Sequence, residues 1–366
     1  MIDIILHNLL SFIFIISIIV FVHEFGHYYI AKICGVKIEQ FSIGFGKEIF
    51  GFNDKHNTRW KFCLIPFGGY VKMFGDRNPA SLPSDEIKTF SKEEKSTSFY
   101  FQNVYKRIAI VIAGPLANFI LAIFLLTIIF KINGIQQTLP IISKISKNSP
   151  AEKSSILPND KILKINNKNI NSFEMIKEFV IINGDEELLF HIERDGKVIM
   201  INILPEMREK KDIFDNQVKL PFVGLEANKT IKKKLSILEA LSVSVRRTYE
   251  MSANILTSLS QLVTGQKSLK ELGGPVKIAQ YSGKSINMGL IMTLYFIAII
   301  SINLGVINLL PIPTLDGGHL FFYIIEVLKG KPVSEKIQNY SFKFGITFII
   351  MLMSFTILND ILSFFL

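Results

Sequence analysis

The chain has 366 residues, of which 49% are hydrophobic and 20% charged, whereas soluble domains carry about 25% charged residues. This composition excludes a disordered, collagen-like or disulfide-stapled chain and argues against a soluble enzyme. The formal net charge of +10 is compatible with nucleic-acid binding, but Lys and Arg cluster beside long apolar runs. Because anionic bilayers select that pattern, we expect a lipid bilayer as partner and no nucleic acid.

Four stretches approach or exceed the roughly 20 apolar residues that a membrane-spanning helix needs. They cover residues 4–30, 108–132, 288–310 and 342–366. The first stretch could be a signal peptide, but no Lys or Arg precedes it and no small-residue cleavage site follows. We therefore predict an uncleaved span and a polytopic α-helical membrane protein with four transmembrane helices.

The distribution of Lys and Arg predicts the orientation of these spans. Basic residues follow the first span, precede the second, and lie between the last two, while the N-terminus has none. Segments 31–107 and 312–341 are therefore expected in the cytosol, with both termini and the segment 133–285 extracytoplasmic.

The first apolar stretch contains the sequence His23-Glu24-Phe25-Gly26-His27. Residues four apart share one face of a helix, so both imidazoles would point at one spot, and neutral imidazole binds zinc well. A glutamate next to the first histidine can act as a general base. A polar contact between helices without metal is the alternative, but three ionisable groups in a membrane helix are costly unless they have a function.

Two histidines leave a catalytic zinc one protein ligand short. We expect Asp316 to supply it, from the stretch Asn308-Leu-Leu-Pro311-Ile-Pro-Thr-Leu-Asp316-Gly317-Gly318-His319. The prolines interrupt the third span, and the two glycines allow a sharp return of the chain. Asp316 could instead lie in a cytosolic turn or cap a helix, and His319 is a competing ligand.

These motifs occur in a fixed order with three others, and together they resemble the site-2 protease family of intramembrane zinc metalloproteases, in its bacterial regulator-of-sigma-E protease branch. The other three are Phe41-Ser-Ile-Gly-Phe-Gly46, Gly68-Gly-Tyr-Val-Lys-Met73 and Gly114-Pro-Leu-Ala-Asn118. The resemblance implies Zn²⁺ held by His23, His27 and Asp316, with Glu24 catalytic. It also implies residence in a bacterial cytoplasmic (inner) membrane and cleavage of single-span substrates, typically an anti-sigma factor or a remnant signal peptide.

Apolar and polar residues alternate around glycines between residues 38 and 74, which predicts two strands joined as a hairpin. An ordinary cytosolic hairpin would show the same pattern. In the family this region resembles a re-entrant β loop that offers an edge to an unwound substrate. The expected substrate-binding residues are Gly68, Gly69, Tyr70, Asn308 and Pro311. For Gly114-Pro-Leu-Ala-Asn118, a small-residue packing face is at least as well supported as a place in the substrate cavity.

The remaining segments complete the predicted domain organisation. Residues 75–98 indicate a solvated cytosolic loop. Residues 137–206 resemble one PDZ domain, with a turn at Asn159, then a helix at 173–181, and then strands at 188–192 and 198–203. Residues 235–263 predict an amphipathic helix, either at the outer membrane interface or packed on the PDZ domain. Pro275, after two glycines, is expected to open a short helix.

The predicted domains are therefore 1–132, with two spans and the hairpin; 133–210, PDZ-like; 211–285, with interfacial helices; and 286–366, with the last two spans.

An intramembrane zinc endopeptidase is the leading hypothesis for the function. A metal transporter would also use intramembrane His and Asp, but the chain shows no matching half-repeats. A non-catalytic PDZ scaffold would need neither Glu24 nor zinc. No signal in the sequence indicates an oligomeric state.

Overall fold

The computed structural model describes residues 2–76, 89–184, 186–211, 217–265 and 273–365. They fold into two compact units. Unit 1 combines residues 1–129 and 238–366, and unit 2 comprises residues 130–237.

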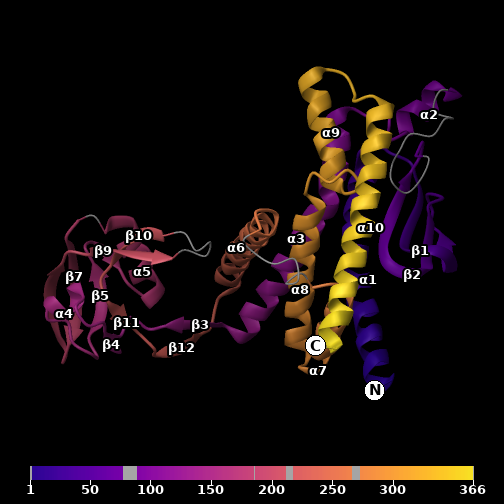
Figure 1. The fold of residues 1–366 in the computed structure, drawn as a ribbon. Coiled ribbons are helices and arrows are strands. Elements are labelled where there is room, and N and C mark those ends of the chain that lie inside the picture. The colour runs from indigo at the N-terminus through magenta and orange to yellow at the C-terminus, as the bar shows by residue number, and fades with distance from the viewer. Residues whose placement is uncertain (1, 77–88, 185, 212–216, 266–272, 366) are drawn as a thin grey trace. The chain divides into compact units, whose positions relative to one another are not determined.

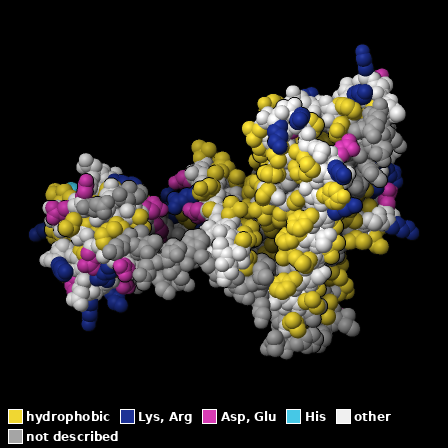
Figure 2. All heavy atoms as spheres, turned by 45° about the horizontal axis from the view of Figure 1, so that its top comes forward, with side chains coloured by type: hydrophobic (Ala, Val, Ile, Leu, Met, Phe, Trp, Pro, Cys, Tyr) yellow, Lys and Arg dark blue, Asp and Glu magenta, His cyan; other side chains and the backbone are white. Residues whose placement is uncertain are grey.

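In its described residues, unit 1 has four helices that are long and apolar enough to span a membrane, which confirms the four predicted spans. They are α1 (Ile2–Ile33), α3 (Val104–Asn133), α8 (Leu290–Asn308) and α10 (Glu335–Phe365). These helices run along a common direction (Figure 1). Hydrophobic side chains cover much of their visible surface (Figure 2), as lipid-facing helices require.

The helices α1 and α3 approach each other closely next to the His-Glu motif. A Cβ atom at Gly26 would overlap the carbonyl oxygen of Ala113, so this contact is open only to glycine. The close approach brings the backbone of α3 within reach of the histidine side chains on α1.

The predicted hairpin is confirmed as β1 (Ile38–Asn53) and β2 (Arg59–Met73), which pair antiparallel. Both strands bend, so that Phe41 has a pairing partner on either side, Val71 and Trp60. Three glycines with positive φ, at 44, 46 and 68, accompany the bends. Phe41 and Val71 are buried in one apolar cluster with Tyr28 of α1 and Ile110 of α3, which fixes the hairpin to the helices.

The prediction of a loop over residues 75–98 is wrong in its second half. Residues Lys92–Thr97 form α2, which begins with a capping box: Ser91 accepts from the Glu94 amide, and Glu94 accepts from that of Ser91. Two orphan amides of the first turn are thereby satisfied, so a six-residue helix forms in polar sequence. The part of the predicted loop at 77–88 lies outside the described residues.

The glycines after Asp316 do not make the expected return, because they belong to the first turn of α9 (Asp316–Lys329). Cβ atoms at Gly317 and Gly318 would overlap the carbonyl oxygens of Leu310 and Ile312, respectively. The two glycines thus allow the start of α9 to lie close to the preceding proline-rich segment. The helix ends at Gly330, which has a left-handed conformation.

Unit 2 is an α/β domain with a buried apolar core that includes Ile162, Leu188 and Phe190. Its central sheet has the strand order β6-β5-β7-β8. The predicted turn, helix and strands are present, and Asn159 has a φ of 75°. The elements up to β8 are β3 (Ile135–Thr138), β4 (Lys144–Ile145), α4 (Pro150–Lys153), β5 (Lys161–Ile165), β6 (Lys168–Asn169), α5 (Phe173–Asn183), β7 (Leu188–Arg194) and β8 (Lys197–Ile203).

The domain extends to residue 237 and does not end at 210 as expected. Residues assigned to interfacial helices instead form β10 (Gln217–Phe222), β11 (Leu225–Glu226) and β12 (Thr230–Lys233), after β9 (Glu206–Lys211). β11 pairs with β4 and β12 pairs with β3, so the end of the domain returns to its beginning. β11 and β12, with two and four residues, are too short to show the alternation that identifies a strand.

The predicted helices after this domain are confirmed as α6 (Ile237–Val263) and α7 (Pro275–Asn287). The face of α6 with Ala240, Ser244 and Thr248 is buried, whereas Leu238 and Tyr249 are three-quarters exposed. A helix that buries small and polar residues while exposing large apolar ones suits a lipid environment better than water.

Candidate active site

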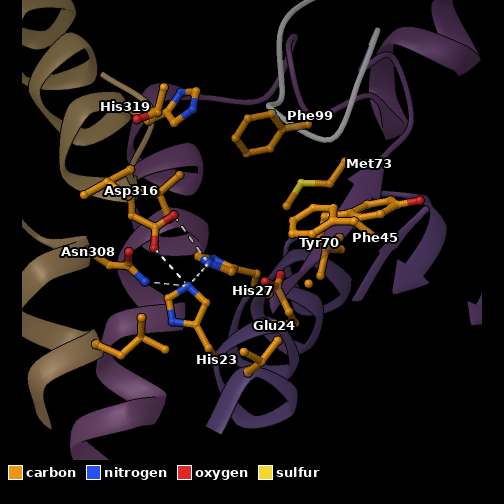
Figure 3. A pocket seen from close by; sticks show the side chains of 18 of the residues that line it. His23, Glu24, His27, Phe45, Tyr70, Met73, Phe99, Asn308, Asp316 and His319 are labelled. Atoms are coloured by element: carbon orange, nitrogen blue, oxygen red, sulfur yellow. Dashed lines mark hydrogen bonds and ion pairs between the residues drawn. The ribbon is translucent and has the colours of Figure 1, made fainter. Parts of the chain in front are cut away.

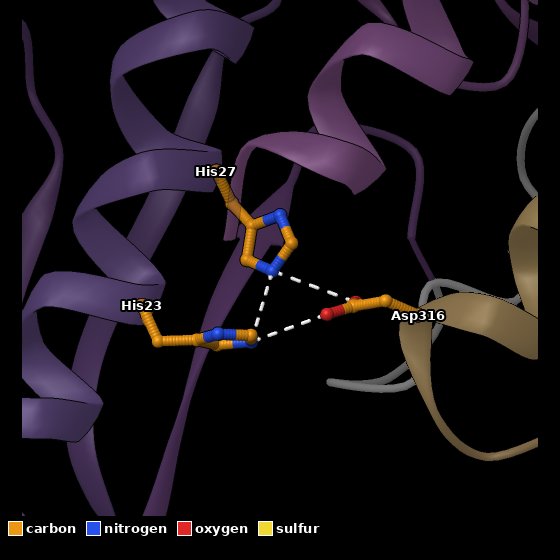
Figure 4. A group of neighbouring side chains, drawn as sticks. All are labelled: His23, His27 and Asp316. Atoms are coloured by element: carbon orange, nitrogen blue, oxygen red, sulfur yellow. Dashed lines mark hydrogen bonds and ion pairs between the residues drawn. The ribbon is translucent and has the colours of Figure 1, made fainter. Parts of the chain in front are cut away.

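Three side chains from distant parts of the sequence meet in unit 1. His23 and His27 lie one turn apart on α1, and their Nε2 atoms are 3.3 Å apart. Asp316, the first residue of α9, places its carboxylate oxygens 3.2 Å from His23 Nε2 and 3.5 Å from His27 Nε2 (Figure 4). The face that the helical spacing predicted is thus completed by an acid from the other end of the chain.

This arrangement fits a divalent metal ion. His27 Nδ1 donates to the carbonyl oxygen of Ile110 over 2.8 Å, so a neutral His27 directs the lone pair of Nε2 toward the centre of the group. Asp316 Oδ2 is buried there without a hydrogen bond in the described part of the chain, although it lies 3.2 Å from His23 Nε2. The lone pair of His27 Nε2 and the Asp316 carboxylate face each other over 3.5 Å and need a cation between them. Ligands of a tetrahedral zinc, each at about 2.0–2.1 Å, lie about 3.3 Å apart, which matches these separations.

His319 does not join this group. It lies one helical turn after Asp316, and its ring packs 5.2 Å from the ring of Phe342, between centroids. The only candidate metal group among the described residues consists of His23, His27 and Asp316. Of the two ligands that the sequence left in competition, the structure brings the carboxylate to the histidines.

Glu24 and Asn308 flank the metal group within the same cavity, which has a volume of about 370 Å³ (Figure 3). Glu24 is buried on α1, and its Cγ approaches the backbone of Gly69 in β2. Asn308, the last residue of α8, places its amide nitrogen 3.3 Å from His23 Nε2. The cavity has the size of a ligand-binding pocket and holds a carboxylate and an amide beside the metal group.

The hairpin supplies one wall of this cavity. Of the residues expected to bind substrate, Gly68, Gly69 and Tyr70 line it, whereas Pro311 is exposed and lies outside the lining. The sequence analysis did not identify Phe45, Met73 and Phe99 as lining residues. Phe45 and Met73 lie within motifs that it did single out, but no signal in the sequence marks Phe99.

The segment Gly114-Pro-Leu-Ala-Asn118 packs against the histidines and is not among the residues that line the cavity. A Cβ atom at Gly114 would overlap His27 Nε2 and lie 2.9 Å from His23 Cε1. Asn118 is completely buried, with its side-chain amide nitrogen 3.1 Å from His23 Nδ1. Of the two predicted alternatives, the packing face is therefore confirmed, and it packs against the metal ligands themselves.

A His-His-Asp metal group with an adjacent glutamate, whose two histidines are buried on a candidate membrane-spanning helix, defines a metalloprotease-type centre in a multi-pass membrane protein. The chain belongs to peptidase family M50, whose profile matches residues 11–352. It is therefore a zinc metalloprotease.

Curated relatives match nearly the whole chain. A protein of Rickettsia conorii, named as a candidate zinc metalloprotease, is 40% identical over 364 residues, which is 98% of this chain and 99% of that protein. A protein of Rhizobium meliloti with the same designation is 38% identical over 356 residues, 96% of this chain and 95% of that protein. Metalloprotease MmpA of Caulobacter vibrioides is 33% identical over 377 residues, again 96% and 95%.

Proposed function

We propose that this protein is an intramembrane endopeptidase of the site-2 protease type, in the regulator-of-sigma-E protease branch, that cleaves transmembrane segments of single-span proteins. The observation that carries the proposal is the position of the metal group. His23 and His27 lie inside the apolar helix α1, and Asp316 follows the apolar helix α8 by eight residues. A metal site at that depth favours peptide bonds that are themselves embedded in the membrane.

The protein's own groups can perform the proton transfers of peptide hydrolysis. Zinc, when bound, lowers the pKa of a bound water and polarises a carbonyl group. Glu24 is the carboxylate in the cavity next to the ligands, so we assign it to accept the proton of the attacking water and deliver it to the leaving amine. We assign Asn308 to hold the substrate backbone or stabilise the oxyanion.

The substrate has to be unwound before one of its peptide bonds can approach the metal. Residues 69–73 of β2 pair with residues 38–43 of β1 on one side. On their other side no strand pairs with them in the described part of the chain, and Gly69, Tyr70, Val71 and Met73 border the cavity. This edge supports a model in which β1 and β2 re-enter the membrane and an extended substrate adds to β2 as a further strand.

The topology and the source of substrates follow from the same model. The positive-inside pattern places both termini and unit 2 outside a bacterial inner membrane, with the hairpin on the cytosolic side. Unit 2 is assigned as a single PDZ-like domain that selects substrates, and α6 as an interfacial helix. Anti-sigma-factor-like proteins trimmed outside the membrane, and remnant signal peptides, are the substrate classes that suit this arrangement.

The test is cleavage of a co-expressed single-span substrate, run beside metal analysis of the purified full chain. Glu24→Gln is expected to abolish cleavage and to retain zinc. His23→Ala, His27→Ala and Asp316→Asn are each expected to lose both. Cleavage by Glu24→Gln at the wild-type rate would exclude the assigned role of Glu24. Cleavage confined to soluble peptides would exclude intramembrane proteolysis.

A further inference from the structure

Asn118 carries an unexplained polar contact to a metal ligand. Its side chain is completely buried on α3, and its amide nitrogen lies 3.1 Å from His23 Nδ1. Its carbonyl oxygen Oδ1 is buried without a hydrogen-bond partner among the described residues. An orphaned acceptor beside a metal ligand is costly, because the group loses its hydration without a replacement.

The orientation of this amide corresponds to one tautomer of His23. With the amide nitrogen of Asn118 donating, Nδ1 is an acceptor, and in the metal-free protein a neutral His23 carries its proton on Nε2, which lies 3.2 Å from Asp316 Oδ2 and 3.3 Å from the amide nitrogen of Asn308. A metal on Nε2 requires the other tautomer, with the proton on Nδ1. The N–H of Nδ1 would then face the NH₂ group of Asn118, and two donors would oppose each other.

We propose that Asn118 turns its amide when zinc binds, so that Oδ1 takes the place of the nitrogen and accepts the N–H of His23 Nδ1. The two ends of an amide are nearly equal in size, so this rotation needs no new space in a closely packed region. It gives the orphaned oxygen a partner and fixes His23 in the metal-binding tautomer. Asn118 is thus a positioning residue that acts through His23.

The second histidine shows the same arrangement, already formed. His27 Nδ1 donates to the carbonyl oxygen of Ile110, which lies eight residues before Asn118 on α3. Gly114 lies midway between these two, where its lack of a side chain admits both imidazole rings. Positions 110, 114 and 118 are spaced four apart and so share one face of α3. This face of α3 contacts the Nδ1 atoms of both histidine ligands: that of His27 through a backbone oxygen and that of His23 through a side chain.

The choice of asparagine follows from the two tautomers. An amide can donate to the metal-free form of His23 and accept from the metal-bound form, whereas a carboxylate can only accept and leucine can do neither. Partners of this kind behind a ligating histidine typically contribute 10- to 100-fold to metal affinity. Zinc affinity is therefore the direct measure of the role of Asn118, and it does not depend on the substrate proposed above.

The experiment compares Asn118→Leu with Asn118→Asp in the purified full chain, by chelator competition for zinc and by the visible spectrum of the cobalt-loaded protein. Leucine keeps a similar volume but removes the acceptor, and we expect zinc affinity to fall about 10- to 100-fold. Aspartate keeps the acceptor, and we expect affinity within about threefold of wild type together with an unchanged cobalt spectrum. The matched control is Ser301→Ala, which removes only the 2.9 Å hydrogen bond to the backbone oxygen of Asn118 and is expected to bind zinc normally.

Two results would overturn the proposal. Wild-type zinc affinity in Asn118→Leu would show that no acceptor is needed. An equal loss in Asn118→Asp and Asn118→Leu would show that packing or the amide donor matters, and not the acceptor. Should Asn118→Leu fail to insert or fold, Asn118→Asp decides alone: retained affinity supports the proposal, and a loss of tenfold or more contradicts it. Failure of the intramembrane protease assignment would leave all these outcomes unchanged, since none of them measures cleavage.

Discussion

At the scale of single residues, the metal group depends on an absence of side-chain atoms at Gly114. The imidazoles of His23 and His27 occupy the space in which any other residue on α3 would place its Cβ. Interiors are packed to crystal-like density, so one added methyl group cannot be absorbed without displacing a neighbour. Here the neighbours are the ligands themselves.

We therefore predict that Gly114→Ala displaces His27 and lowers bound zinc well below one ion per chain, with a parallel loss of cleavage. Overpacking of this kind costs about 1–3 kcal/mol, so the protein should still insert and fold. Metal analysis of the purified variant is the measurement. Gly273→Ala is the control, because among the described residues a Cβ there meets only the Lys277 side chain, at 3.8 Å. Full zinc occupancy in Gly114→Ala would show that α3 can move away from the histidines.

The ligands could be predicted from the sequence, but their support could not. His23 and His27 are spaced by one helical turn, and Asp316 is an acid beside a broken apolar stretch, so local pattern and the ligand requirement of zinc suffice. The role of Gly114 and Asn118 depends on which face of α3 meets α1. Close packing between the two helices decides which face it is, for example between His23 and Asn118, which are 95 residues apart in sequence. Apolar helices with little amphipathic pattern do not reveal that face.

At the scale of elements, one carboxylate adds a polar contact between the hairpin and α1 to the apolar cluster around Phe41. Asp54, in the turn between β1 and β2, accepts from the Tyr28 hydroxyl over 3.0 Å and from the Trp60 indole over 3.2 Å. The backbone amides of His56 and Thr58 also donate to it. Partial burial raises the pKa of Asp54, but these hydrogen bonds outweigh that effect, beginning with the amide of Thr58, and the pKa falls to about 2. Because the folded pKa lies below the ordinary value, the stabilisation is complete above about pH 4 and disappears as the pH falls toward 2.

We predict that Asp54→Ala loosens the hairpin at neutral pH without removing zinc. Tyr28 directly follows the ligand His27. The two histidine side chains are nevertheless held by contacts with α3 and with Asp316 of α9, and none of these contacts involves Asp54. Limited proteolysis should become faster within residues 48–65, and cleavage of membrane substrates should fall while metal content stays constant. Lys55→Ala, at an exposed position of the same turn, is the control. Unchanged proteolysis would show that the buried cluster around Phe41 holds the hairpin alone.

The edge of β2 leads to a prediction about the substrate. If the substrate adds to residues 69–73 as a strand, its helix must first unwind around the cut, and helix-weakening residues reduce that cost. Gly lowers helix stability by about 1 kcal/mol and Pro by about 3 kcal/mol relative to Ala. We expect Gly near the cut to raise the cleavage rate severalfold and Pro to raise it more. The same substitutions placed one or two turns away, outside the unwound segment, are the control. Cleavage that is indifferent to both positions would contradict strand addition.

Three elements escaped sequence analysis, for two different reasons. Residues Asp316–Lys329 were assigned to a cytosolic segment that began with a return at the glycines, but close contact with carbonyl groups of the proline-rich segment makes the glycines the first turn of α9. Strands β11 and β12 have only two and four residues, too few for a period of two to be seen. They form because β4 and β3 offer partners, which is a tertiary cause.

At the scale of the whole molecule, unit 2 is an insertion between two helices of unit 1. It starts and ends on adjacent strands, since Ile135 of β3 lies opposite Lys233 of β12. Lys131 also donates to the carbonyl oxygen of Leu235 over 3.1 Å. The chain therefore enters and leaves unit 2 at nearly the same point. A domain inserted in this way can be removed without stretching the rest of the chain.

We predict that replacing residues 135–233 by a short Gly-Ser linker leaves an inserted protein that binds one zinc ion and cuts. Every metal-group residue belongs to unit 1, so the loss of unit 2 should affect only the choice of substrates, and untrimmed substrates should now be cleaved as well. The measurements are metal content and cleavage of trimmed and untrimmed single-span substrates. Deleting only residues 137–206 is the comparison: it removes β4, the partner of β11, and half of β3, the partner of β12, and the product should aggregate or be degraded. Loss of zinc from a well-inserted 135–233 replacement would mean that unit 2 is part of the metal site's support.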